Sequence, residues 1–231
     1  MKLNDDSSAR NKWKGLQQMK EERALIKEHL DLYLGNVDPF AFMSVEENVP
    51  DDMRAGEVDE EGWVKWKCIP STIADEEIRE LEAEFAVTFP PLLKALLQTY
   101  HYIDLHFNNV KEEDGYKGDC RFIEMPAMSS EDRLSNYRFL LQAWEPLIAA
   151  GYVPFTECED SQGPVCFDTR RMDEDGDCPV IWILHDYLHE LGEEGARVRE
   201  NVLPHVHDIF ASFREMIVTL CLMRDTEEQE D

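Results

Sequence analysis

The chain has 231 residues, of which 43% are hydrophobic, so it can form one large domain or two small ones with a sizeable core. It carries 50 Asp and Glu against 23 Lys and Arg, a formal net charge of −27 at pH 7. The field of so acidic a protein repels phosphate, which argues against nucleic acid and anionic membranes as general partners and favours basic proteins. No stretch approaches the roughly 18 apolar residues that span a bilayer.

The amino-terminal residues are polar and lack the hydrophobic region of a signal peptide, so a cytoplasmic location is expected. In that compartment the six cysteines would be reduced thiols. They form no Cys-x-x-Cys pair, and buried thiols are therefore a better interpretation than a zinc or redox centre.

Residues 1–35 are predicted to form a helical extension, because apolar residues recur at helical spacing and Gly35-Asn36 suits a helix end. This least acidic part of the chain is expected to pack on the acidic body, and contact with a partner is the alternative. Residues 36–62 are predicted to form an acidic linker, since Pro39, Pro50 and Gly56 interrupt any periodicity.

The main domain is predicted to span residues 63–223, followed by an acidic tail at 224–231. Its first helix is expected to begin at Thr72-x-x-Asp75, which resembles a capping box. A second helix should follow Pro90-Pro91, because proline suits a first helical turn. The buried stripes predicted for the two helices are Ile78, Leu81 and Phe85, then Leu92, Leu93, Leu96, Leu97 and Tyr100.

Beyond these helices the apolar spacing changes towards two, which indicates strands. A strand is expected at residues 121–125, and a helix at residues 130–150. A last amphipathic helix is predicted over residues 206–223. Helices, short antiparallel strands and a closing helix are typical of an α+β domain. Three strands at hairpin-like spacing are predicted between the last two helices, at residues 153–157, 165–167 and 179–184.

Motifs for common enzyme chemistry are missing from the sequence, including the Gly-rich phosphate loop and the G-x-S-x-G elbow. His185 and His189 stand four residues apart, as two metal ligands on one helical turn would. The zincin pattern needs Glu directly after the first His, and Asp186 occupies that place. A metal-dependent hydrolase that uses His185, Asp186 and His189 is one hypothesis for the function. The sequence predicts no catalytic residue, no metal and no cofactor.

Two blocks of the sequence follow a recognisable order of motifs. The first block, residues 73–97, is an acidic helix with an Ile-x-x-Leu-Glu core, a Val-Thr-Phe-Pro step and a second helix. The second block is a strand ending in Phe-Asp at residue 168, then a strand ending in His-Asp at residue 186, before a Phe-containing final helix. Together the two blocks resemble the SUKH superfamily, the group that contains the Smi/Knr cell-wall-synthesis regulators. The resemblance covers residues 63–223, and the preceding 62 residues have no counterpart in it.

The resemblance implies a curved antiparallel sheet flanked by helices, in a binding protein without catalytic residues. Bacterial SUKH domains are mostly immunity proteins that neutralise a cognate polymorphic toxin, often a nuclease, whereas fungal members act as regulatory scaffolds. A nuclease face is basic because it holds phosphates, so an acidic inhibitor would be steered to it. The predicted function is an immunity protein with a basic toxin as its partner. A regulatory or scaffolding module is the alternative.

Two acidic runs border the predicted sheet, and we expect them to face the partner. Aromatic side chains at the domain edge would supply buried contact area. The alternative is that the acidic runs form a solvated rim. The residues predicted to contact the partner are Trp66, Tyr152, Glu157, Glu159, Asp160, Asp173, Glu174, Asp175 and Asp177.

Overall fold

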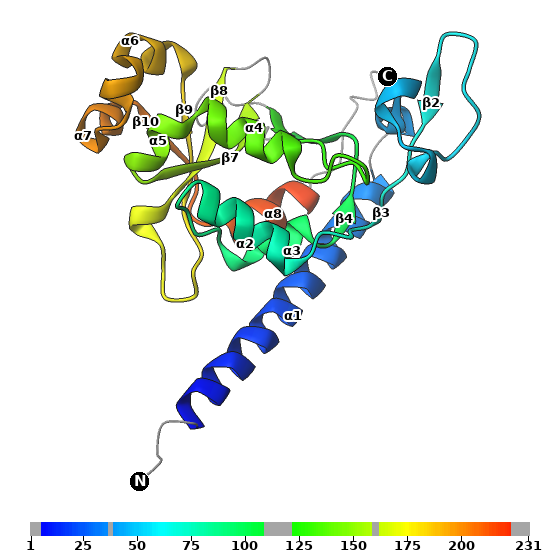
Figure 1. Ribbon diagram of the computed structural model, residues 1–231. Coiled ribbons are helices and arrows are strands. Elements are labelled where there is room, and N and C mark those ends of the chain that lie inside the picture. Colours follow the sequence, from blue (N-terminus) through cyan, green and yellow to red (C-terminus); the bar gives the residue numbers. More distant parts are fainter. Residues whose placement is uncertain (1–5, 37–38, 109–121, 159–161, 223–231) are drawn as a thin grey trace, which may run out of the picture.

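The computed structural model describes residues 6–36, 39–108, 122–158 and 162–222. Its centre is a six-stranded sheet in the order β10-β9-β8-β7-β6-β5, in which every neighbouring pair is antiparallel (Figure 1). The order in space follows the order in the chain, so the sheet is a meander. Its strands are β5 Leu105–Asn108, β6 Phe122–Met125, β7 Tyr152–Cys158, β8 Gly163–Asp168, β9 Val180–Ile183 and β10 Val206–Phe210.

Helices cover both faces of the sheet, which confirms the predicted α+β fold. Between β6 and β7 the chain forms α4 and α5, and between β9 and β10 it forms α6 and α7. The helices are α1 Asp6–Asn36, α2 Asp75–Glu84, α3 Pro91–Leu97, α4 Ser135–Ala143, α5 Glu145–Ala149, α6 His185–Ala196, α7 Arg199–Val202 and α8 Phe213–Leu222.

The central strands β7, β8 and β9 bury side chains on both faces. On one face, Phe155 stacks on Phe167 with ring centroids 4.0 Å apart, and both rings contact Phe213 of α8. On the other face, Cys166 and Ile181 belong to a second cluster formed with α5, α6 and α7. A strand buried on both faces has an almost continuous apolar sequence, which is why the runs at these positions predicted the three strands.

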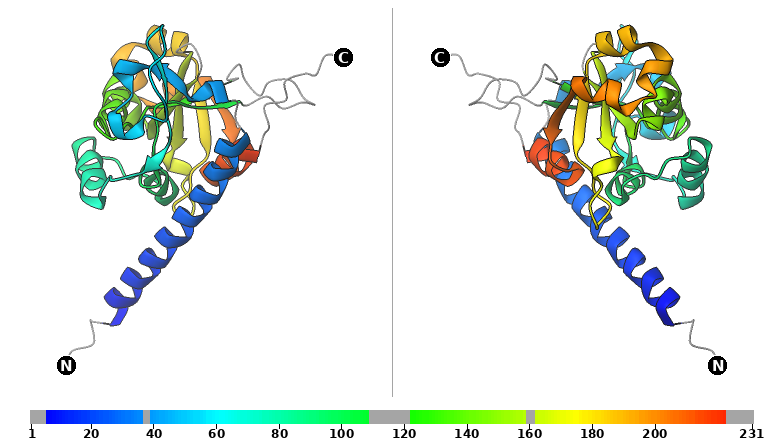
Figure 2. Two further views of the ribbon diagram at one scale, coloured as in Figure 1. Left: turned by 90° about the vertical axis from the view of Figure 1, so that its right-hand side faces the viewer. Right: turned by 90° about the vertical axis from the view of Figure 1, so that its left-hand side faces the viewer.

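Helix α1 confirms the predicted amino-terminal helix. Its carboxy-terminal part packs on α3 and α8, with Ile26 and Leu30 fully buried, whereas its amino-terminal end projects away from the body (Figure 2). Glu22 is 7% exposed and accepts hydrogen bonds of 2.7 Å on both carboxylate oxygens from Arg214 of α8. This ion pair fastens the helix to the body.

Residues 36–62 differ from the expected linker. Strand β1, Met43–Val45, pairs with β2, Trp63–Lys65, across the predicted boundary at residue 63. Two short 3-10 helices follow β1, and the side chains of Val49 and Met53 enter the main core with 2% and 0% exposure. Pro39 begins a further 3-10 helix, Pro39–Phe42, before β1, and Pro50 directly precedes the 3-10 helix Asp51–Met53, so both prolines belong to local turns.

The helices predicted at residues 130–150 and 206–223 differ in the structure. The segment 206–223 begins with strand β10 and only then forms α8, because residues 206–210 pair with the edge of β9. The segment 130–150 is divided into α4 and α5, with Pro146 in the first turn of α5. Proline lacks an N–H and clashes with the preceding turn, so it starts a helix more readily than it continues one.

The two helices predicted first, α2 and α3, are confirmed, but their ends differ. Residue Ala74 precedes α2, and its backbone N–H donates to Glu77 over 2.9 Å, so Thr72 is not the cap. Tyr100 does not extend α3, because it lies in β4, Tyr100–His101, which pairs with β3, Ile69–Pro70.

Candidate protein-binding surface

Two carboxylates of the acidic turn of residues 172–177 hold the fold, one by closing the turn and the other by bonding to α8. Asp173 Oδ1 accepts hydrogen bonds from the backbone N–H groups of Asp175 and Asp177, at 3.0 and 2.9 Å. The carboxylate of Asp177 accepts from the backbone N–H groups of Phe213 and Arg214, at 3.0 and 3.2 Å. Asp177 therefore caps the amino terminus of α8, although it lies some 36 residues earlier in the chain.

Glu174 and Asp175 in the same turn are exposed. The turn lies against α1, because the side-chain amide of Gln18 donates to the backbone carbonyl of Asp175 over 2.9 Å. These two carboxylates are available on the surface, whereas Asp173 and Asp177 are engaged in the fold.

Trp66 and Tyr152 do not lie on the surface, contrary to the expectation that they anchor a partner. Trp66 is 1% exposed and packs edge-on against Phe42, and Tyr152 is 0% exposed beneath the guanidinium of Arg199, 4.5 Å from its ring centre. Trp66 follows β2 into the main core, and Tyr152 begins the central strand β7. Neither ring can contact a partner in this fold.

Glu157 lies apart from the acidic turn. It is half-buried on β7, where its Oε1 accepts a hydrogen bond of 2.9 Å from the indole N–H of Trp144. Its neighbour across the sheet is Glu124 of β6. Glu159 and Asp160, predicted for the same surface, lie outside the described residues.

Asp168, which ends the Phe-Asp strand β8, is a buried carboxylate with two arginine partners. Its Oδ2 accepts from Arg171 and Arg199, each at 2.7 Å, and its side chain is 1% exposed. Burial alone would raise the pKa of Asp168, but the hydrogen bonds from the two guanidinium groups hold it below its ordinary value. Asp168 thus joins the end of β8 to α7 and serves the fold.

Three adjoining clefts form a groove along α4, which we call the α4 groove. The acidic cleft, about 810 Å³, lies between residues 46–54 and the loop before α4. The middle cleft, about 280 Å³, lies between α4 and β6, and shares Ile103, Ala127 and Asn136 with the acidic cleft. The Trp144 cleft, about 330 Å³, lies between α5 and α6 and shares Ala143 with the middle cleft.

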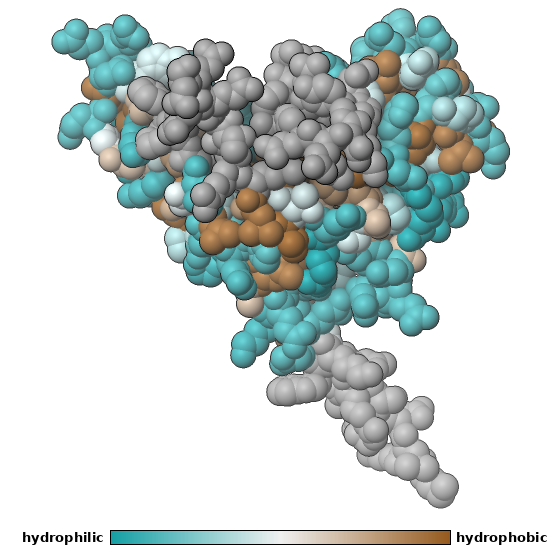
Figure 3. Space-filling model, turned by 180° about the vertical axis from the view of Figure 1, so that it is seen from behind, coloured by the Kyte–Doolittle hydropathy of each residue, from teal (hydrophilic) through white to brown (hydrophobic). Residues whose placement is uncertain are grey.

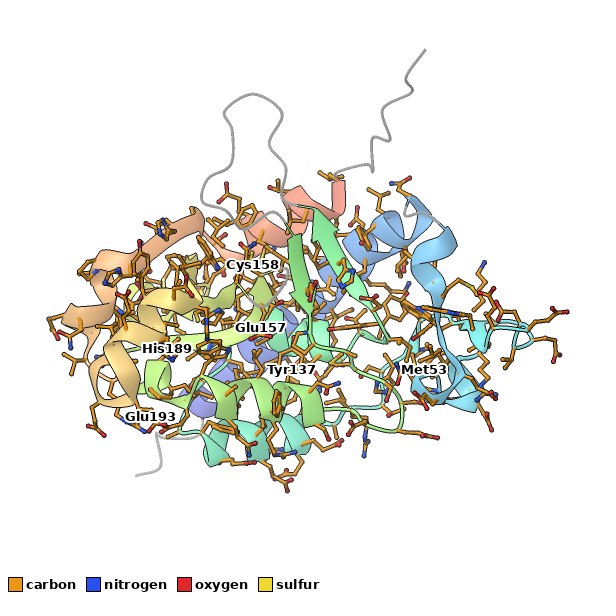
Figure 4. The ribbon with its side chains drawn as sticks, turned by 90° about the horizontal axis from the view of Figure 1, so that it is seen from above. Met53, Tyr137, Glu157, Cys158, His189 and Glu193 are labelled. Carbon is orange, nitrogen blue, oxygen red and sulfur yellow. The ribbon has the colours of Figure 1, made fainter. Side chains whose placement is uncertain are left out.

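One face of α4 lines the groove. Asn136, Phe139, Leu140 and Ala143 follow the i, i+3, i+4, i+7 spacing of a single helical face, and all four line the middle cleft. Phe139 is 71% exposed, whereas Tyr137 on another side of the helix is fully buried. In Figure 4, α4 runs between His189 and Glu193 on one side and Met53 on the other, with Glu157 between them.

The acidic cleft is lined by five carboxylates and one guanidinium. That guanidinium belongs to Arg54, which pairs with Glu46 and Asp51 at 3.1 and 3.5 Å. Two further carboxylates line the middle cleft and one lines the Trp144 cleft. The negative charge of the groove is therefore concentrated at the acidic cleft, which suits a cationic ligand.

His185 and His189 lie at the opposite end of the groove, on the first turns of α6. The His185 ring meets Trp144 edge-on at 5.8 Å, and its centroid is 6.3 Å from that of His189. Among the residues that the structure describes, no group of three or more His, Cys, Asp or Glu side chains could hold a metal ion. Both histidines line the Trp144 cleft, next to the Trp144 side chain.

The α4 groove was not predicted from the sequence, because its lining residues come from separate parts of the chain. One signal was present. Phe139 falls outside the apolar stripe of Tyr137 and Leu141 that packs α4 into the core. A large apolar residue off the buried stripe of a helix marks a possible second contact face.

The described residues thus form an α+β domain with acidic clefts on its surface. A comparison with protein-family models matches residues 72–218 to the SMI1/KNR4 family (SUKH-1). The match covers more than half of the chain, so the chain belongs to this family, as its sequence blocks indicated. A search of curated proteins found no match.

Members of this family are generally non-catalytic, and its domains are often immunity proteins. The matched region runs from the residues before α2 into α8, and contains α4 and the whole central sheet. Within the described part of the chain, no helix has the length and apolar character needed to cross a membrane.

Proposed function

We propose that this protein is an immunity protein that neutralises a cognate protein toxin by binding it through an acidic surface. The observation that carries the proposal is a net charge of −27 in a member of a family whose domains are often immunity proteins. A toxin that acts on nucleic acid needs a basic face, and an acidic inhibitor both finds and covers such a face.

The net charge of −27 makes long-range attraction to a basic partner part of the proposal. Hydrophilic residues cover most of the coloured surface on the face seen from behind (Figure 3). Charge on such a surface accelerates encounter with an oppositely charged partner, and salt screens this attraction over about 8 Å at physiological ionic strength. The association rate with the toxin should therefore fall as salt is added.

The state of the buried thiols supports a non-catalytic role. A cysteine nucleophile reacts as the thiolate, and burial raises the pKa of Cys68, Cys178 and Cys221 to about 12. Burial also raises the pKa of Cys166 well above its ordinary value. These four side chains are neutral at pH 7. Cys166, Cys178 and Cys221 serve as small apolar groups in the core, and the half-buried Cys68 packs against it.

The proposal is tested by capture of the partner followed by a toxicity assay. The tagged full chain is used as bait in lysate from the cell that encodes it, at low and then moderate salt, and retained proteins are identified by mass spectrometry. We expect one dominant basic protein, whose expression arrests growth alone and does not arrest it when this chain is co-expressed.

Several weakly held host proteins, none of them toxic, would contradict the immunity role. That outcome would support the alternative, a regulatory or scaffolding module related to the cell-wall-synthesis regulators for which the family is named.

A further inference from the structure

We propose that the α4 groove is the docking site for an extended basic segment of the partner, which places an apolar or aromatic side chain in the Trp144 cleft. The inference rests on the function proposed above and specifies where the partner binds and what chemistry it presents. The acidic turn of residues 172–177, by comparison, is a smaller part of the recognition surface or none of it.

The shape of the groove favours an extended segment. The nine residues of α4 span about 13 Å at 1.5 Å per residue, and the clefts continue beyond both ends of the helix. An extended chain advances about 3.3 Å per residue, so roughly four residues would pass along α4 alone. The exposed Phe139 stands in the middle of this path.

Charge at the acidic cleft points to a cationic partner. Glu47, Glu131 and Asp132 are exposed, and the described residues give their carboxylates no hydrogen bond or ion pair. Arg54, by contrast, is already paired with Glu46 and Asp51. Lys or Arg side chains of a partner would therefore find carboxylates that no cationic side chain of the described residues neutralises.

The Trp144 cleft at the other end is suited to an apolar group. Its lining includes Trp144, Pro146, Leu147 and Leu188, and the indole is held in place by its hydrogen bond to Glu157. A fixed aromatic ring can bury a partner side chain without losing conformational freedom itself. Its neighbours Glu157 and Glu193 would attract basic residues on either side of the apolar one.

Two matched pairs of variants test the proposal. Ala143 is exposed and lines both the middle cleft and the Trp144 cleft, so Ala143→Arg adds bulk and positive charge where the two meet. Gln142 is the preceding exposed residue of α4 and lines none of the three clefts, so Gln142→Arg adds the same group outside the groove. The second pair consists of two double variants. Glu131→Lys with Asp132→Lys reverses charge in the groove, and Glu174→Lys with Asp175→Lys is the control that reverses the same charge in the acidic turn.

The probe is a displayed library of random 12-residue peptides, selected on the wild-type full chain and then measured one by one. We expect the selected peptides to carry an apolar or aromatic residue flanked by Lys or Arg. Their affinity should fall at least tenfold for Ala143→Arg and for the Glu131/Asp132 pair. It should stay within about twofold for the Gln142→Arg and Glu174/Asp175 controls. Equal melting temperatures show that each variant folds.

The proposal would be overturned if no peptide is enriched, if the peptides lack this pattern, or if the groove and control variants bind them equally. Failure here is distinct from failure of the immunity function. If a captured toxin binds Ala143→Arg as tightly as wild type, the groove is not the docking site, and the immunity function still stands. If the selected peptides depend on the groove but no captured protein is toxic, the groove is a binding site and the immunity function is contradicted.

Discussion

In the acidic turn of residues 172–177, carboxylates accept hydrogen bonds from backbone amides of the same chain, whereas in the α4 groove exposed carboxylates line an open cleft. Asp177 caps α8 and Asp173 closes the turn, but Glu131 and Asp132 hold no other part of the described chain. Both regions contribute to the charge of −27. The acidic residues of this chain therefore divide between those that hold its fold and those that are exposed at an open cleft.

The largest expected effect concerns Asp168, the most deeply buried of the carboxylates that hold the fold. Asp168→Ala removes the shared acceptor of Arg171 and Arg199 and leaves two guanidinium groups beside the core. We expect the free energy of unfolding to fall by about 3 kcal/mol, measured by urea denaturation. Asp208 also pairs with Arg171 but is 64% exposed, so Asp208→Ala should cost less than about 1 kcal/mol. Equal losses would contradict this role.

A smaller loss is expected at the cap of α8. Asp177→Ala leaves the amide groups of Phe213 and Arg214 without their acceptor, which should cost about 1–2 kcal/mol in the same assay. Asp175→Ala is the control, because its carboxylate is exposed, and its effect should lie within about 0.5 kcal/mol. A larger loss of stability from Asp175→Ala than from Asp177→Ala would contradict the conclusion that Asp177 holds the fold and Asp175 does not.

Acid should destabilise the protein through His101, which is buried and neutral. Its Nε2 accepts from the backbone N–H of Thr72 over 2.9 Å, so Nδ1 carries the proton and donates to the carbonyl of Met128 over 3.1 Å. Burial lowers the pKa of His101 from its ordinary 6.5, because the charged form is poorly solvated, and a weaker effect of Arg133 acts in the same direction.

A lowered pKa means that the unfolded chain binds this proton first, so the contribution of His101 to stability is complete above about pH 6.5 and is lost as the pH falls below it. The slope attributable to one such proton is at most about 1.4 kcal/mol per pH unit. His101→Gln should reduce the slope of the unfolding free energy against pH between pH 7 and pH 5, whatever the substitution does to stability at pH 7. An unchanged slope would show that His101 does not titrate with folding.

The smallest effect on stability is expected in the groove. Glu131→Lys with Asp132→Lys should change the free energy of unfolding by no more than about 0.5 kcal/mol, because both carboxylates are exposed and support no neighbour. Thermal unfolding checks this directly. A loss of more than about 1 kcal/mol would place these residues with Asp177, among the carboxylates that hold the fold.

Much of the fold could be predicted from local patterns. The apolar runs of β7, β8 and β9 and the Leu-rich stripe of α3 are continuous in sequence, so local spacing identified them. Strand β10 could not be distinguished from a helix, because Ile209, Phe210 and Phe213 also fit one helical face. What decides the outcome is the free edge of β9, which is a property of the tertiary structure.

The candidate site was harder to predict than the fold. The sequence shows that residues 173–177 are acidic, but not that two of these carboxylates accept from backbone amides, one of them at α8. The burial of Trp66 and Tyr152 likewise depends on neighbours distant in the chain. The α4 groove joins residues from 46 to 196, and no local pattern could have brought them together.

The most direct test of the account is the affinity of the captured toxin for two charge-reversed proteins, measured by calorimetry beside wild type. Both the Glu131/Asp132 pair and the Glu174/Asp175 pair change the net charge equally when mutated to Lys, so non-specific attraction is matched. We predict that the groove pair weakens binding at least about tenfold, and that the turn pair changes it by no more than about twofold. Equal losses, or a greater loss from the turn pair, would contradict the division of the acidic surface.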